Sequence, residues 1–204
     1  MHRYWIWLAG RPGLGSRGRQ ALLRHFPNPE AIYRAAPEAL QTIPELTPEG
    51  LKALADKSLD RAEAICRDCS QKQIRILTLS DGAYPKRLKQ ISDPPLVLYA
   101  KGELPELDSL PAIGVVGTRQ CSAYGLSAAC AMGYQIGRCG GIVVSGLAAG
   151  IDRAAMEGCL KARQPVVGVP GCGVDVVYPT GNRELYAAVE RSGCILSQYP
   201  PRTP

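Results

Sequence analysis

Two apolar runs that each end in a glycine-rich loop decide the fold of this chain: Ala112-Ile-Gly-Val-Val-Gly-Thr-Arg119 and Gly141-Ile-Val-Val-Ser-Gly-Leu-Ala-Ala-Gly150. The residues between them, 124–138, have a helical pattern. Short apolar strands separated by helices of about 10–15 residues are typical of a parallel sheet covered on both faces. The two runs therefore predict an α/β fold.

The same alternation continues to the end of the chain. We predict strands at 113–116, 141–144, 165–169 and 194–197, with helices at 124–138, 150–161 and 182–191. This order indicates a Rossmann-like, doubly wound parallel sheet. Four strands are about half of such a sheet, so we expect it to be incomplete, with an apolar edge left uncovered.

The first third of the chain has a different pattern. Residues 1–72 contain short apolar stretches interrupted by prolines, which predicts a small all-helical domain whose last helix spans 60–71. Its Pro12-Gly-Leu-Gly15 turn could hold a phosphate, as a helix-hairpin-helix does. Strands predicted at 74–79 and 96–99 lead into the second domain. The predicted domains are therefore 1–72 and 73–204.

The residues with useful chemistry follow the predicted strands. In open α/β sheets ligands bind outside the carboxyl ends of the strands, where loop glycines admit a ligand and helix N-termini attract anions. The predicted phosphate-binding residues after the first two strands are Gly117, Thr118, Arg119, Ser122, Ser145 and Gly146. A third loop, Gly171-Cys-Gly-Val-Asp175, follows the next strand. The alternative is that these glycines serve only tight turns and packing.

Several ligand and reaction classes fit the sequence poorly. The first turn, Gly114-x-x-Gly117, lacks the G-x-G-x-x-G fingerprint, and Ser145 stands where a ribose-binding acid is expected, which argues against NAD or FAD. No cofactor is expected. The α/β half has no histidine, and Cys172 has no visible base to activate it. An acid–base pair of Asp152 and Asp175 remains the catalytic alternative, and we predict that the chain is not an enzyme.

Composition restricts the partners and the cellular location that fit this chain. The net charge of +6 suits a polyanionic partner. No apolar run approaches the roughly 18 residues that would span a bilayer, and no secretory signal is evident, so we expect a cytoplasmic protein without a membrane partner. The eight cysteines include only one C-x-x-C, at Cys66 and Cys69, which predicts reduced thiols and no metal site.

The loops resemble those of the DNA-processing protein A (DprA/Smf) family. The resemblance lies in Gly114-Val-Val-Gly-Thr-Arg119, Ser145-Gly-Leu-Ala-Ala-Gly-Ile-Asp152 and Gly171-Cys-Gly-Val-Asp-Val-Val-Tyr-Pro179 with Asn182. Upstream, Asp93-Pro-Pro-Leu-Val-Leu-Tyr-Ala-Lys-Gly102 resembles the family's entry segment, and the N-terminal helices its SAM-like or helix-hairpin-helix domain.

The resemblance implies a non-enzymatic, single-stranded DNA-binding protein of natural transformation that protects incoming DNA and loads the RecA recombinase. It also implies a homodimer. By motif match, the DNA pocket would be lined by Gly117, Arg119, Ser122, Ser145, Gly146 and Asn182. The hydrolase alternative is a Rossmann-like phosphoribohydrolase, whose Pro-Gly-Gly-x-Gly-Thr-x-x-Glu motif this chain lacks, and a third reading is a small nucleotide sensor.

Three departures from the family pattern are visible. Met156 stands where the family commonly has a histidine, and Gln198 where it has a glutamate. The chain stops at Pro204, before the Phe-Pro-x-Arg-Asn-Arg-type segment that the resemblance leads us to expect. We therefore expect a C-terminally truncated form that binds DNA more weakly than a full-length relative.

Overall fold

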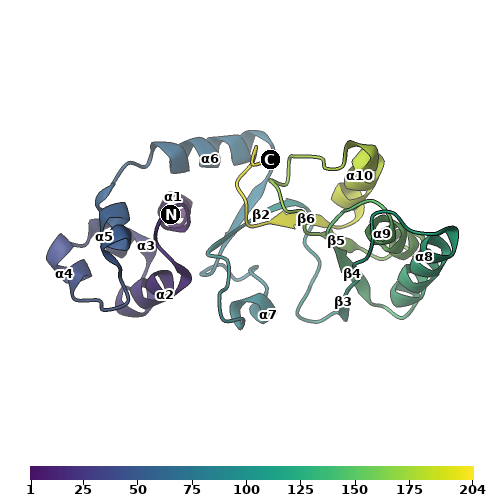
Figure 1. The fold of residues 1–204 in the computed structure, drawn as a ribbon, viewed down its shortest axis with the longest axis horizontal. Helices are drawn as coiled ribbons and strands as arrows, with labels where there is room; N and C mark the ends of the chain where they lie inside the picture. The colour runs from purple at the N-terminus through teal and green to yellow at the C-terminus, as the bar shows by residue number, and fades with distance from the viewer.

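A computed structural model describes residues 1–204, and its N-terminal part is built of six short helices (Figure 1). They are α1 (His2–Ala9), α2 (Ser16–His25), α3 (Pro29–Arg34), α4 (Pro37–Gln41), α5 (Pro48–Ala55) and α6 (Asp60–Gln71). Three of them begin with proline, whose fixed φ suits the first helical position. Asn28 and Thr47 cap two of these starts. The predicted helix at 60–71 is confirmed.

The rest of the chain forms one six-stranded sheet. Its strands are β1 (Arg75–Thr78), β2 (Val97–Gly102), β3 (Ala112–Gly114), β4 (Ile142–Ser145), β5 (Val166–Gly168) and β6 (Cys194–Ser197), in the order β1-β2-β6-β5-β4-β3. The last four strands in chain order are parallel, whereas β1 and β2 run antiparallel to their neighbours. The predicted α/β fold with a helical N-terminal part is confirmed, and the segment 73–110 makes the sheet mixed.

The two faces of the sheet are covered differently. Helices α8 (Ala123–Arg138), α9 (Ile151–Lys161) and α10 (Arg183–Ser192) pack on the face that carries Val143, Val166 and Ile195. The opposite face packs against Leu88 and Leu107, which belong to α7 (Lys86–Lys89) and the segment after β2. In Figure 1, α7 lies below the sheet and α10 above it. The helices predicted to cover both faces thus lie on one.

The prediction of a buried strand at 113–116 is wrong. The structure has a three-residue strand there, β3, which pairs only with β4 and forms one edge of the sheet. Ile113 is 42% exposed and Val116 is 77% exposed. The reason is that no other strand of this chain pairs with the free side of β3. An apolar edge was expected from the sequence, and β3 is that edge.

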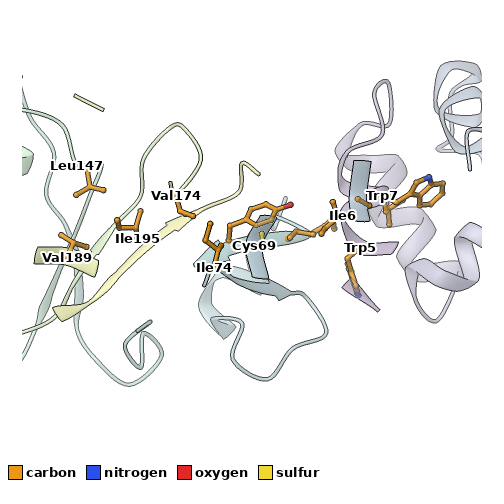
Figure 2. Close-up of a cluster of buried hydrophobic side chains, with 14 of the residues drawn as sticks. Trp5, Ile6, Trp7, Cys69, Ile74, Leu147, Val174, Val189 and Ile195 are labelled. Carbon is orange, nitrogen blue, oxygen red and sulfur yellow. The ribbon is translucent and has the colours of Figure 1, made fainter. Parts of the chain in front are cut away.

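One hydrophobic cluster connects the N-terminal helices with the sheet. It runs from Trp5 and Trp7 in α1 through Cys69 and Ile74 to Ile195 in β6 (Figure 2). The helical part therefore packs against the sheet, while the division into domains at residues 72 and 73 stays a prediction. No helix in the structure has the length and apolar character needed to cross a membrane.

Candidate functional site

The loops that follow β3 and β4 contact each other at the carboxyl edge of the sheet. The Ile151 N–H donates to the Thr118 carbonyl oxygen at 3.3 Å. Gly150, just before α9, has φ +82°, and a Cβ added there would lie 2.3 Å from the same Thr118 oxygen. Only glycine combines this backbone conformation with so close an approach. The site therefore begins with two loops fixed against one another.

Asp152, in the first turn of α9, holds these loops from within. Asp152 is buried, with 4% of its surface exposed. Oδ1 accepts the Gly117 N–H at 3.2 Å, and Oδ2 accepts the Gly146 N–H at 3.1 Å. The sequence predicts that Gly117 and Gly146 bind a phosphate, and it gives Asp152 only as a member of the alternative acid–base pair. In the structure the carboxylate takes the place expected for the ligand anion.

The predicted hydroxyl donors are also engaged inside the protein. Ser145 Oγ donates to the Val115 carbonyl oxygen at 2.6 Å, which joins the start of the first loop to the end of β4. Ser122 is the N-cap of α8, and its Oγ accepts the Gly125 N–H at 3.1 Å. Thr118 Oγ1 bonds to the backbone of Gln120. These side chains shape the loops.

Asn182 has a comparable internal role. It is 2% exposed, and its Nδ2 donates to the Leu147 carbonyl oxygen at 2.9 Å. Leu147 has φ +61°, a left-handed conformation that costs a non-glycine residue about 1–3 kcal/mol. Arg153 Nη1 donates to Asn182 Oδ1 at 3.3 Å. The amide thus stabilises a strained residue in the loop after β4.

Arg119 is the predicted residue whose charge stays exposed. It takes part in no hydrogen bond or ion pair, and its guanidinium carbon lies 5.9 Å from the centre of the Tyr178 ring. Tyr178 is 60% exposed. Tyr124, in the turn of α8 that follows the same loop, is 83% exposed. Tyr178 is not among the predicted site residues; in the structure it lies just before the 3-10 turn at Thr180–Asn182.

Asp152 and Asp175, the two carboxylates of the alternative acid–base pair, have different hydrogen-bond partners. Asp152 bonds to loop amides, whereas Asp175 bonds to Lys72 and to the Arg202 N–H, and Asp68 pairs with both of these residues at 3.0 and 2.7 Å. Burial would raise the pKa of Asp175, but the bonds from Lys72 and the Arg202 amide hold it below its ordinary value. The two carboxylates of the predicted pair thus belong to separate networks.

The next groups to consider are the cysteine thiols and the side chains that could bind a metal ion. Burial, with a smaller contribution from Asp175, raises the pKa of the Cys172 thiol, which opposes formation of a nucleophilic thiolate. All eight cysteines are free thiols. No three His, Cys, Asp or Glu side chains lie close enough to form a metal site. What the loop edge offers a ligand is a cation beside an aromatic ring.

Sequence comparison identifies the family. The family model for DNA recombination-mediator protein A matches residues 75–204, which include the whole sheet and every loop of the site. The chain belongs to this family. It is 32% identical over 201 residues to the Smf protein of Synechocystis, a match that covers 97% of this chain and 50% of that protein. It is 35% identical over 182 residues to DprA of Bacillus subtilis, covering 84% and 60%.

Solved structures agree on the fold. The X-ray structure of DprA from Streptococcus pneumoniae matches all of this chain and 70% of that one, with a TM-score of 0.80 and 24% identity. DprA from Helicobacter pylori, described for its single-stranded DNA binding mode, matches 65% of this chain with a TM-score of 0.57 and 28% identity. The chain spans 50–60% of the length of the Synechocystis and Bacillus relatives.

Proposed function

We propose that this chain binds single-stranded DNA at the Arg119–Tyr178 pair and acts in DNA processing. The observation that carries the proposal is the exposed guanidinium at the carboxyl edge of the sheet, free of any carboxylate and placed beside an exposed aromatic ring. A guanidinium can contact a phosphate, and an aromatic ring can stack on a base, which are the two contacts that single strands favour. The net charge of +6 adds a favourable field.

The loop network supports the proposal by fixing the pair in place. Arg119 lies in the loop that contacts Gly150, and Tyr178 is next to the turn that ends at Asn182. Hydrogen bonds accepted by the Asp152 carboxylate and donated by the Asn182 amide hold the loops between them. A ligand would therefore find the loops that carry the cation and the ring already ordered, which lowers the entropy cost of binding. Stacking and phosphate contact carry little base preference, so we expect little sequence specificity.

Family membership extends the proposal beyond this chain's own residues. We propose that the bound strand is transforming DNA, that RecA is loaded onto it, and that a homodimer is the active form. Relatives named for DNA processing in Bacillus and Streptococcus support the first of these roles. We also propose that the chain binds without catalysis, because Asp152, Asp175 and Cys172 are each engaged in structural contacts.

A titration tests the proposed function. A fluorescent oligo-dT and a duplex of the same length would be titrated with the 204-residue chain at low and near-physiological salt. We expect the single strand to bind more tightly, and its affinity to fall as salt rises because phosphate contacts release counterions. Equal affinity for duplex, or an affinity independent of salt, would contradict the proposal. Release of a free base from a nucleoside monophosphate would instead favour the hydrolase alternative.

A further inference from the structure

A second cationic site lies where the N-terminal helices meet the sheet. A cavity of about 340 Å³ is enclosed there by α1, α2, α6, the residues before β2 and those after β6. Three arginines line it, Arg11, Arg19 and Arg61, and Asp93 is the single acid among the lining residues. None of the residues predicted for the loop site takes part. The cavity is thus separate from the Arg119–Tyr178 pair.

Two of the three guanidinium groups have no carboxylate partner. Arg11 pairs with Asp56 at 2.8 Å, but Arg19 and Arg61 take part in no ion pair. Arg19 donates from Nη2 to the Ala9 carbonyl oxygen at 3.2 Å, and its Nε is buried without an acceptor. The Nε itself lies too deep to reach a ligand, but Arg19 Nη1 and the exposed Arg61 guanidinium make no hydrogen bond within the chain and are available to an anion in the cavity.

The surroundings already carry an excess of positive charge. The Lys57 ammonium is buried without a hydrogen-bond partner and lies 5.3 Å from the centres of the Trp7 and Tyr33 rings. Burial, and then the nearby charge of Arg11, lower the pKa of Lys57. Trp7 also lines the cavity. Lys57 does not line the cavity, but its charge adds to those of Arg19 and Arg61, and a positive potential in a partly enclosed space favours the binding of an anion.

The walls of the cavity indicate what else the ligand carries. Tyr199 is the aromatic residue of the lining that a planar ligand can reach, since it is 40% exposed while Trp7 and Tyr99 are buried. The volume lies at the lower end of the range of about 300–1,000 Å³ that is usual for small-molecule sites. We propose that this cavity binds a phosphate-bearing planar ligand, either a free nucleoside monophosphate or the terminal nucleotide of a DNA strand. Arg19 and Arg61 would contact the phosphate.

Calorimetry with thymidine 5′-monophosphate tests the proposal on the 204-residue chain. The Arg61→Ala variant is compared with Arg67→Ala, a matched control because Arg67 is an exposed arginine on the same helix that does not line the cavity. Loss of one charged hydrogen bond should weaken binding about tenfold in Arg61→Ala, and Arg67→Ala should bind like the original chain. No heat of binding for the original chain, or equal affinity in both variants, would overturn the proposal.

Asp93 provides a second variant whose effect has the opposite sign. Asp93→Asn removes the one negative charge on the cavity lining and should tighten binding of thymidine 5′-monophosphate by about threefold. Unchanged or weaker binding would count against an anion in the cavity. Thymidine, which lacks the phosphate, should not bind at the same concentrations; if it binds as well as the monophosphate, the proposal is wrong.

Two further ligands distinguish the possible sources of the phosphate. Competition by 5′-phosphorylated oligo-dT but not by the unphosphorylated strand would assign the cavity to a strand end, and competition by neither would assign it to a free nucleotide. The Arg119→Ala variant separates this proposal from the proposed function. It should bind thymidine 5′-monophosphate like the original chain, and a matching loss would show that the ligand sits at the loop site instead.

Discussion

The Asp152 network and the Arg119–Tyr178 pair belong to the same loop edge, yet they use their polar groups in opposite ways. Asp152 is buried and bonds to Gly117 and Gly146, so that its charge is compensated by the protein itself. Arg119 is exposed and bonds to nothing in the chain, so its charge is available to a partner. In the proposed site, one motif thus supplies both the residues that fix the loops and the residue that would contact the ligand.

Residues of the same motif can therefore have different roles. Ser145 and Asn182 are part of the same motifs as Arg119, but their side chains bond to the Val115 and Leu147 carbonyl oxygens. Changing such a residue should alter binding through the shape of the loops. Changing Arg119 should remove the proposed ligand contact and leave the loops intact. The two kinds of residue can be separated by measuring stability and DNA binding on the same variant.

The largest effect is expected from Gly150→Ala. A Cβ at this position would lie 2.3 Å from the Thr118 carbonyl oxygen, at φ +82°. Relieving the clash must separate the two loops, so we expect a loss of about 3 kcal/mol or more in the free energy of unfolding and weaker DNA binding. Urea denaturation measures the first. Gly171→Ala is the matched control, since a Cβ there has no neighbour within 4 Å, and it should be nearly neutral.

Asp152→Ala should have the next largest effect. It leaves the Gly117 and Gly146 amides without their acceptor, and we expect a loss of about 2–3 kcal/mol in unfolding free energy. Oligo-dT affinity should fall with it, because the loop that carries Arg119 is no longer fixed. A variant that loses DNA binding at unchanged stability would instead place Asp152 in direct contact with the ligand and would contradict its role as a support of the loops.

Ser122→Ala is expected to have a smaller effect. The serine caps α8 by accepting the Gly125 N–H, and loss of an N-cap costs about 1 kcal/mol. Because the hydroxyl is engaged with this amide, we expect oligo-dT affinity to change by less than about twofold. Thermal denaturation and the oligo-dT titration measure the two quantities. A strong loss of affinity without a loss of stability would make Ser122 a ligand contact, as the sequence predicted.

The smallest expected effect is that of Asp68→Asn on the dependence of Tm on pH. A side-chain bond from Arg202, followed by one from Lys72, lowers the pKa of Asp68, so this carboxylate stabilises the fold above its unfolded pKa of about 3.8. That stabilisation is lost as the pH falls through the lowered folded pKa. Asp68→Asn should therefore reduce Tm at neutral pH and flatten its decline between about pH 5 and about pH 2. An unchanged acid profile would show that this ion-pair network contributes nothing measurable.

The sequence predicted the positions of the strands and helices better than it predicted their burial. Alternating apolar runs and helices located β4, β5, β6 and the helices between them, because local periodicity determines these elements. The exposure of β3 was missed, since burial depends on neighbours that a strand's own residues do not encode. In the N-terminal part, the prolines indicated a series of short helices, of which only α6 was predicted with its bounds.

At the site, the sequence identified the loops but not the partners of their polar groups. Which acceptor takes the Gly117 and Gly146 amides depends on where Asp152 lies after folding, and a motif does not specify that. The place of Tyr178 next to Arg119 was also beyond prediction, because the two residues are far apart in the chain and meet only through the sheet. Roles that depend on tertiary contacts required the structure.

The salt dependence of oligo-dT binding by Arg119→Ala shows whether this guanidinium contacts the phosphates of the strand. Arg191→Ala is the control, because this exposed arginine lies near the end of α10, whose ten residues extend about 15 Å from the turn beside Tyr178. We predict that Arg119→Ala weakens binding by about tenfold and lowers the slope of log K against log salt by about one, at unchanged stability. An affinity and slope equal to those of the original chain and of Arg191→Ala would contradict the account.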